Sequence, residues 1–226
     1  MICGEELVYM QTPEMLGCSF CGEQQTETVK CVNGHFICNK CHSAGPNDFI
    51  ERYCGNTELT DPVEMADQIM LHPGFHMHGP EHHFLVPAVL LASYYNLQGK
   101  TEPKKEKISV ARQRSEKVPG GFCGSHGNCG AGVGTGIFFS IITGTTPLSG
   151  ETWQLSNLLT GSCLLEIAKK GGPRCCKRDT YTALTHTVDF IRKKLGVHLP
   201  ATSDIRCRFH PQNKQCLASK CEYFNG

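Results

Sequence analysis

The distribution of apolar and polar residues divides the chain into a head, a body and a tail. Residues 1–55 hold few apolar positions, whereas apolar residues recur at helical spacing from Leu59 onward. The stretch 84–97 is apolar on nearly every side, which predicts a buried central helix. The pattern therefore predicts a mainly α protein. Its parts are a zinc-ribbon-like or treble-clef head, a helical bundle and a metal-binding tail, over residues 1–55, 56–200 and 201–226.

Residues typical of helix starts and helix ends refine the predicted bounds of the helices in the body. Asp61 is an N-cap residue with proline at the next position and Glu64 in place to close a capping box. The stretch 100–117 holds seven Lys or Arg against three Glu, which predicts a surface helix with Pro103 at its first position. Alternating strand patterns are almost absent outside the head. Later helices are expected to end near 143, to run over 152–170 and to run over 179–195.

Net charge and hydropathy limit the kinds of binding partner that we expect. The 226 residues have a net charge of +1, so no strong field draws the chain to nucleic acid or to a membrane surface. The basic helix at 100–117 offers RNA only a weakly supported contact surface. No run of about 20 apolar residues predicts a membrane span, and residues 1–16 lack the features of a secretory signal. We expect a cytoplasmic protein, and the sequence leaves its oligomeric state open.

Fifteen cysteines in such a chain favour metal ligation over disulfides. Two Cys-x2-Cys motifs lie sixteen residues apart in the head. Four thiolates from two such turns close a tetrahedron around a structural Zn²⁺ ion and leave no open position for catalysis. Asn33-Gly34 between the motifs predicts a hairpin turn. The expected zinc ligands are Cys18, Cys21, Cys38 and Cys41.

The head also resembles the first six ligand positions of a RING-type finger, because Cys31 and His35 stand between the two motifs. A RING finger needs a further Cys-x2-Cys pair, and Cys54 is followed by Thr57 where its second cysteine is required. We therefore expect one zinc ion in the head, with Cys31 and His35 as packing or supporting residues.

The most glycine-rich stretch, 120–136, carries two cysteines immediately before an apolar run. Its glycines at 130, 132, 134 and 136 form two rows that let other helices approach closely, and its backbone N–H groups can hold an anion. Thiolates from separate loops can hold a [4Fe–4S] cluster, and three of them leave one iron open to substrate. The expected ligands are Cys123, Cys129 and one of Cys175 and Cys176, with Cys163 as a further candidate or a small core residue.

Several residues near these cysteines are candidates for proton transfer and substrate binding. His126 lies between the two loop cysteines and is the principal acid–base candidate. Glu81 and His82 either face the cluster in that role or satisfy backbone groups in a glycine–proline turn. Arg174 and Arg178 either orient a small anionic substrate or form a solvated helix start. A separate mononuclear metal site is the alternative for His76, His78 and His82.

The tail carries a second compact metal pattern, Cys207-x8-Cys216-x4-Cys221, with His210 between the first two cysteines. Three thiols and one imidazole predict a Cys₃His zinc site. A cluster is the alternative occupant.

The segment Cys-Gly-Ser-His-Gly-Asn-Cys-Gly-Ala-Gly-Val-Gly-Thr-Gly at 123–136 resembles the cluster segment of iron–sulfur serine dehydratases and cysteine desulfidases. Those helical proteins eliminate water or sulfide from small amino acids at a [4Fe–4S] cluster, so the resemblance implies Cys123 and Cys129 as cluster ligands. The whole chain resembles an uncharacterised cysteine-rich family of anaerobic prokaryotes.

The leading hypothesis is lyase or sulfur-handling chemistry on a small anionic substrate. The alternatives are a non-catalytic zinc-binding interaction or regulatory module, and an accessory protein that delivers sulfur or metal through the Cys175–Cys176 pair.

Overall fold

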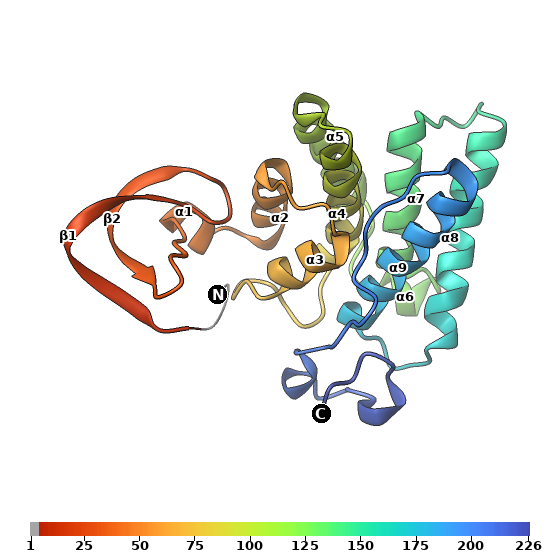
Figure 1. The fold of residues 1–226 in the computed structure, drawn as a ribbon. Helices are drawn as coiled ribbons and strands as arrows, with labels where there is room; N and C mark the ends of the chain where they lie inside the picture. Colours follow the sequence, from red (N-terminus) through yellow and green to blue (C-terminus); the bar gives the residue numbers. More distant parts are fainter. Residues whose placement is uncertain (1–4) are drawn as a thin grey trace.

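The computed structural model describes residues 5–226 and shows a small head beside a bundle of helices (Figure 1). Residues 1–4 of the predicted head lie outside the described part. The head holds β1 (Leu7–Gly17), β2 (Gln24–Cys31) and the short α1 (Asn39–His42). The body holds α2 (Pro46–Asn56), α3 (Pro62–Met70), α4 (Glu81–Leu97), α5 (Thr101–Ser115), α6 (Phe122–Ser125), α7 (Gly130–Thr143), α8 (Glu151–Lys169) and α9 (Cys176–Leu195). The predicted fold class, mainly α with a small N-terminal head, is confirmed.

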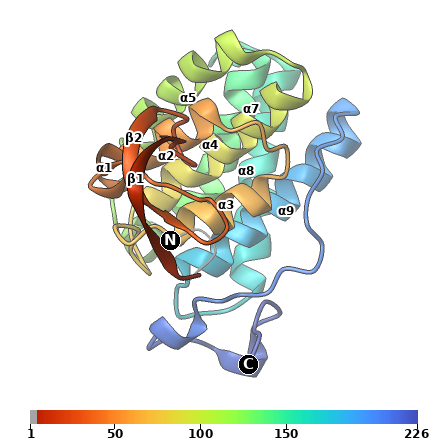
Figure 2. The ribbon, with the colours of Figure 1, turned by 60° about the vertical axis from the view of Figure 1, so that its left-hand side comes forward.

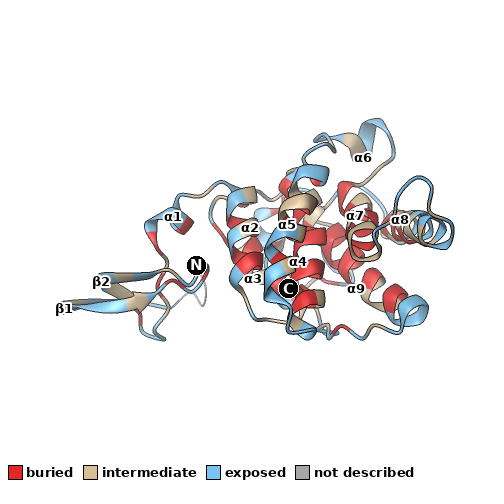
Figure 3. Cartoon of the chain, turned by 90° about the horizontal axis from the view of Figure 1, so that it is seen from above, coloured by how far each residue is buried: buried red, intermediate tan, exposed pale blue. Residues whose placement is uncertain are grey.

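Helix α4 is the centre of the body, as its all-round apolar pattern predicts. It packs against α2, α3, α5, α7 and α9, and Figure 3 shows the buried positions gathered on the sides of these helices that face one another. Asp61 caps α3 as expected, because its carboxylate accepts the backbone N–H groups of Val63 and Glu64. None of the helices within residues 5–226 combines the length and the apolar character that crossing a bilayer requires.

The two glycine rows of α7 pack against two different helices, which confirms their predicted purpose. A Cβ atom on Gly134 would lie 2.9 Å from Cδ of Pro87 and 3.0 Å from the carbonyl oxygen of His83, both in α4. A Cβ atom on Gly136 would lie 2.1 Å from Oγ1 of Thr160 in α8. The absence of side chains on both rows therefore lets α7 lie between α4 and α8 at close range.

The basic helix α5 differs from its prediction in two respects. It begins at Thr101, so Pro103 is its third residue and not its first. It is also not simply a surface helix, because the side chain of Lys104 is 2% exposed. The Lys104 ammonium donates at 2.8 Å to the carbonyl oxygen of Thr57 and at 2.8 Å to Oδ1 of Asn96. A charge pattern cannot show which lysine in a run faces inward.

Replacing Lys104 with alanine is expected to destabilise the body by about 2 kcal/mol, because it removes two charge-assisted hydrogen bonds and leaves Oδ1 of Asn96 without this donor. Urea denaturation measures the change. The matched control is Lys105→Ala, on the exposed side of the same helix, which should alter the free energy of unfolding by less than about 0.5 kcal/mol. Equal effects of the two substitutions would contradict the buried role of Lys104.

Two further local predictions are corrected. Asn33-Gly34 does not join β1 to β2. The two strands pair antiparallel and are connected by residues 18–23, which include the first Cys-x2-Cys motif. Gly34 instead makes a turn with φ +82°, after which Phe36 pairs with Cys18. Helix α9 begins at Cys176, three residues before the predicted start, because the carbonyl oxygen of Cys175 already accepts the N–H of Asp179.

After α9 the chain runs back along the bundle to the other end of that helix, as Figures 1 and 2 show. The tail at 201–226 therefore lies beside the N-terminal end of α9. Its regular structure consists of two single-turn 3₁₀ helices, η1 (His210–Gln212) and η2 (Ala218–Lys220).

Candidate metal centres

The four predicted zinc ligands of the head form one group. The sulfur atoms of Cys18, Cys21, Cys38 and Cys41 all lie within 4.8 Å of one another, and those of Cys21 and Cys38 are 3.7 Å apart. Tetrahedral ligation with Zn–S bonds near 2.3 Å places sulfurs roughly 3.8 Å apart. The first pair lies in the hairpin turn and the second pair at α1, so strand pairing and a helix start bring the four thiols together. This group can hold a metal ion.

The local backbone favours thiolate at one member of this group, Cys18. Burial by itself would raise the pKa of the Cys18 thiol, but hydrogen bonds from the backbone N–H groups of Cys38 and Cys21 outweigh it, and the pKa is lowered. The Cys38 N–H lies 3.4 Å from the Cys18 sulfur. Burial raises the pKa of Cys41 far above its usual range. A bound cation would supply the charge that keeps such buried thiols ionised.

Among residues 5–226, the remaining RING-type positions do not form a second group. Cys31 and His35 contact each other, with 3.2 Å between Sγ and Nδ1, and neither belongs to the four-cysteine group. Cys54 is fully buried within α2 in the apolar core. The described cysteines other than Cys31 are free thiols.

The two cysteines of the glycine-rich loop face a cleft of about 430 Å³. Cys123 lies in α6 and Cys129 is the N-cap residue of α7. The loop between them turns at Gly127 with φ +66°, a conformation that favours glycine. The cleft is also lined by Arg174, which precedes α9, and by Arg178 and Asp179 from the first turn of α9.

The vicinal cysteines diverge. Cys175 faces the tail, where its sulfur lies 3.6 Å from the amide nitrogen of Asn213. Cys176 lines neither the tail cavity nor the cleft of the glycine-rich loop. Burial raises its pKa to about 11 against a backbone hydrogen bond from Gly79, and the neighbouring charges of Asp179, Cys175 and Cys123 add to the increase. The structure thus separates the two residues, because Cys175 lines the tail cavity and Cys176 does not.

Asp179 is the cleft residue that sequence patterns did not single out, because an acidic residue in the first turn of a helix is common. Its carboxylate accepts from Arg178 Nε at 3.1 Å and from the Cys129 thiol at 3.9 Å. Burial raises the pKa of Asp179. Burial also raises the pKa of Cys129 to about 12, and the adjacent Asp179 charge contributes.

The predicted acid–base residues do not line this cleft. The ring of His126 stacks on Phe122 with centroids 4.1 Å apart, and its Nδ1 lies 2.8 Å from Oγ of Ser125. Glu81 instead stabilises the turn before α4, since its carboxylate accepts the backbone N–H of His76 at 3.0 Å. Cys163 lies in the packed core on α8.

His82 is buried in the same turn. Its Nδ1 lies 3.1 Å from the carbonyl oxygen of Gly79, and its Nε2 has no hydrogen-bond partner. Within residues 5–226, the side chains of His76, His78 and His82 do not come together at metal-binding distance.

Lys177 is a buried cation beside both vicinal cysteines. Its side chain is 1% exposed, and its ammonium has no hydrogen-bond partner. The nitrogen lies 4.4 Å and 4.8 Å from the ring centroids of Phe75 and Phe209. Burial lowers the pKa of Lys177 to about 8, against the opposing influence of Glu81, Cys176 and Cys175. A buried charge without a partner is a common mark of a functional site.

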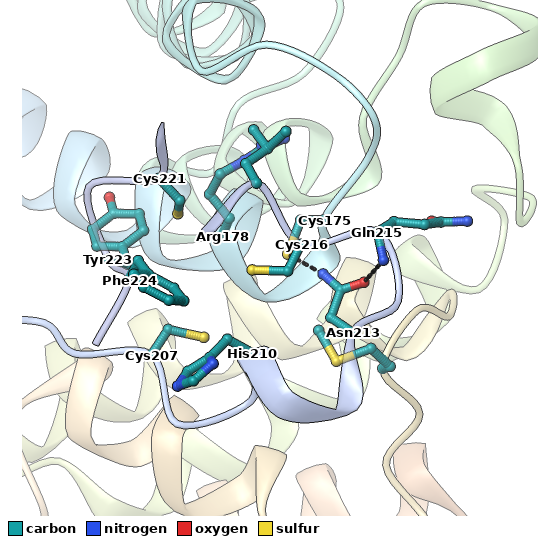
Figure 4. Close-up of a pocket in the computed structure, with 12 residues that line it drawn as sticks. Cys175, Arg178, Cys207, His210, Asn213, Gln215, Cys216, Cys221, Tyr223 and Phe224 are labelled. Carbon is teal, nitrogen blue, oxygen red and sulfur yellow. Dashed lines mark hydrogen bonds between the residues drawn. The ribbon is translucent and has the colours of Figure 1, made fainter. Parts of the chain in front are cut away.

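The predicted tail ligands come together at an enclosed cavity (Figure 4). Cys207, Cys216, Cys221 and His210 all line it, together with Cys175 from the start of α9 and Arg178. Arg178 therefore stands between this cavity and the cleft of the glycine-rich loop.

Comparison with known proteins places the chain in a family. No curated protein and no solved structure matches it. One family model matches residues 50–224, which include the helical body and nearly all of the tail but not the four-cysteine group of the head. Because this match spans most of the sequence, the chain belongs to DUF5714, a family of unknown function.

Proposed function

We propose that the protein is an iron–sulfur enzyme that acts on a small anionic substrate in the cleft of the glycine-rich loop, by lyase or sulfur-handling chemistry. The observation that carries this proposal is the meeting of two thiols and two guanidinium groups at one cleft, namely Cys123, Cys129, Arg174 and Arg178. Thiols suit a soft inorganic centre, and guanidinium groups suit a carboxylate or phosphate.

The donor set fits a cluster better than a single ion. Cys123, Cys129 and Cys176 offer three thiols, yet within residues 5–226 only the head brings three or more sulfurs within 4.8 Å of one another. A cluster has its own width and holds its cysteines farther apart than one ion does. With three protein ligands, a [4Fe–4S] cluster supplies an open iron that acts as a Lewis acid.

The arginines are placed to orient an anion. Arg178 is buried, and its guanidinium donates to Asp179 and, at 3.3 Å, to the carbonyl oxygen of Pro173. Its position is therefore fixed before substrate enters. Arg174 is exposed at the cleft. One preorganised and one mobile guanidinium are well suited to capture a carboxylate and to close over it.

Asp179 is the proton carrier in this proposal, in place of His126. Its carboxylate lines the cleft and contacts the Cys129 thiol, whereas the His126 ring is stacked on Phe122 away from the cleft lining. A carboxyl group whose pKa is raised by burial holds and returns a proton more readily near neutral pH than an exposed one.

The test begins with anaerobically purified full-length protein. We expect a brown sample, and Cys123→Ser and Cys129→Ser should each lose about four iron and four sulfide per chain. Cys54→Ala is the matched control, because Cys54 is a buried core thiol that is not a predicted ligand. This variant should retain its iron and sulfide. Iron, zinc and acid-labile sulfide are quantified together.

Activity is measured as pyruvate release from L-serine and L-cysteine, the simplest hydroxyl and thiol amino acids. Arg178→Lys should weaken substrate binding while the iron content is unchanged. A colourless protein that contains zinc alone would contradict the proposal and favour the non-catalytic zinc-binding module. Persulfide on Cys176 without turnover would favour the sulfur-delivery alternative.

A further inference from the structure

The geometry points to a second metal centre, and it differs from the one that the tail sequence predicts. We propose that four thiolates hold an iron–sulfur cluster that fastens the tail to α9, with His210 outside the ligand set. The four ligands are Cys175, Cys207, Cys216 and Cys221. Three come from the tail and one from the start of a helix in the body, so the centre exists only in the folded chain.

Each of the four thiols reaches the cavity from a different backbone segment. Cys175 is the N-cap residue of α9. Cys207 is held by a backbone hydrogen bond to Tyr223, with 2.7 Å between nitrogen and oxygen. Cys216 follows the η1 turn, and Cys221 follows η2. Figure 4 shows their sulfur atoms directed into one space between the tail and α9.

The surroundings of the sulfurs suit thiolates. The backbone N–H of Ala218 donates to the Cys216 sulfur at 3.3 Å, and the Asn213 amide donates to the Cys175 sulfur. Hydrogen bonds of this kind stabilise the negative charge of a metal-bound sulfur and tune the centre. Asn213 is itself held, because its Oδ1 accepts the N–H of Gln215 at 3.0 Å.

The buried Lys177 ammonium contacts the tail, since its nitrogen lies 4.8 Å from the ring centroid of Phe209. A [4Fe–4S] cluster with four thiolate ligands carries net negative charge. In this proposal that charge adds to the charge of Glu81 in balancing the cation.

Sulfur spacing is our reason for proposing a cluster in the tail cavity and not a zinc ion. The four head sulfurs are all within 4.8 Å of one another, but no three sulfurs in the tail cavity meet that condition. Zinc at about 2.3 Å from each sulfur requires the closer arrangement. Thiols that do not form so close a group suit a multi-iron cluster, which holds its cysteines farther apart than a single ion does. His210 also lines the cavity, where its ring packs edge-on against Phe224 with centroids 4.8 Å apart, and we place it beside the four thiolates and not among the ligands.

A metal centre also explains how the tail is ordered. Residues 201–226 hold few buried apolar side chains, among them Phe209 and Tyr223, and their regular structure is two single turns. A segment with so little core needs a cross-link to keep one conformation. Metal binding supplies it, because the free energy of ligation becomes free energy of folding.

The experiment uses the full chain, purified anaerobically and reconstituted with ferrous iron and sulfide. Cys175→Ser, Cys207→Ser, Cys216→Ser and Cys221→Ser should each lose about four iron and four sulfide. Each should also expose the tail to limited proteolysis, with cuts mapped by mass spectrometry to residues 201–226. His210→Ala should keep its iron and a protected tail.

Cys176→Ser separates this inference from the proposed function. It should lose the iron of the loop cluster and leave the tail protected from proteolysis. Cys175→Ser should keep the iron of the loop cluster, lose the iron of the tail centre and expose the tail to proteolysis. Unchanged iron in Cys175→Ser, or loss of iron in His210→Ala, overturns the ligand set. Loss of zinc instead of iron from the four serine variants overturns the iron–sulfur assignment. Circular dichroism verifies that the helical body of each variant is intact.

Discussion

Replacing Cys38 with serine is expected to release the metal of the head and to unfold residues 5–44, the largest local effect that we predict. The Cys38 sulfur is fully buried and 3.7 Å from that of Cys21, so three thiols are left around an incomplete site. Structural zinc contributes on the order of 10 kcal/mol or more to the folding of comparable small domains. The two strands and short helix of the head have too little core to remain folded without it.

The matched control is Cys31→Ala, which removes another buried thiol from the same head but not from the four-cysteine group. It should keep one metal ion per head. Metal content and amide hydrogen exchange over residues 5–44 are the two measurements. If Cys38→Ser keeps its metal, or if Cys31→Ala loses it, the assigned ligand set is wrong. The helical body should keep its exchange protection in both variants.

Replacing Gly134 with alanine is expected to destabilise the body by about 2–3 kcal/mol. The added Cβ would lie 2.9 Å from the Pro87 ring and 3.0 Å from the His83 carbonyl oxygen. Neither neighbour can move easily: one is a rigid ring and the other is backbone within α4. Pro87 has no N–H for that carbonyl, so the bare Gly134 backbone occupies the space beside it. The added methyl must therefore push α7 away from α4.

Gly161→Ala in α8 is the control, because its Cβ would meet nothing within 4 Å. The same chemical change there should stabilise the protein by about 0.5–1 kcal/mol through helix propensity. Urea denaturation of both variants, each with its metal content verified, measures the difference in sign. Stabilisation in both would show that α7 and α4 are not as closely packed as the structure indicates.

The head illustrates how much spacing alone can predict. Two Cys-x2-Cys motifs specify four ligands because each short turn places its two sulfurs on one side, whatever the rest of the fold does. The structure confirms that these four sulfurs come together. The predicted turn at Asn33-Gly34 is present, closed by a hydrogen bond from the Gly34 N–H to the carbonyl oxygen of Cys31. It follows β2, however, and the first cysteine motif supplies the turn between β1 and β2.

The central cysteines show what the spacing of residues along the sequence cannot predict. Sequence reasoning left Cys175 and Cys176 as equivalent candidates, because adjacent residues have the same spacing to every distant partner. The backbone at the start of α9 separates them, because it places Cys175 in the lining of the tail cavity and leaves Cys176 out of it. Asp179 and Lys177 gain their importance only from burial beside these thiols.

The sequence by itself determined the helical class, the buried α4, the glycine rows of α7 and the four-cysteine group of the head, because each depends on periodicity or on residues close along the chain. Tertiary structure alone decided that Cys175 joins the tail cysteines, that Lys104 is buried and that two arginines meet the loop thiols. Those contacts join residues far apart in sequence, and packing, not local pattern, determines which of them meet.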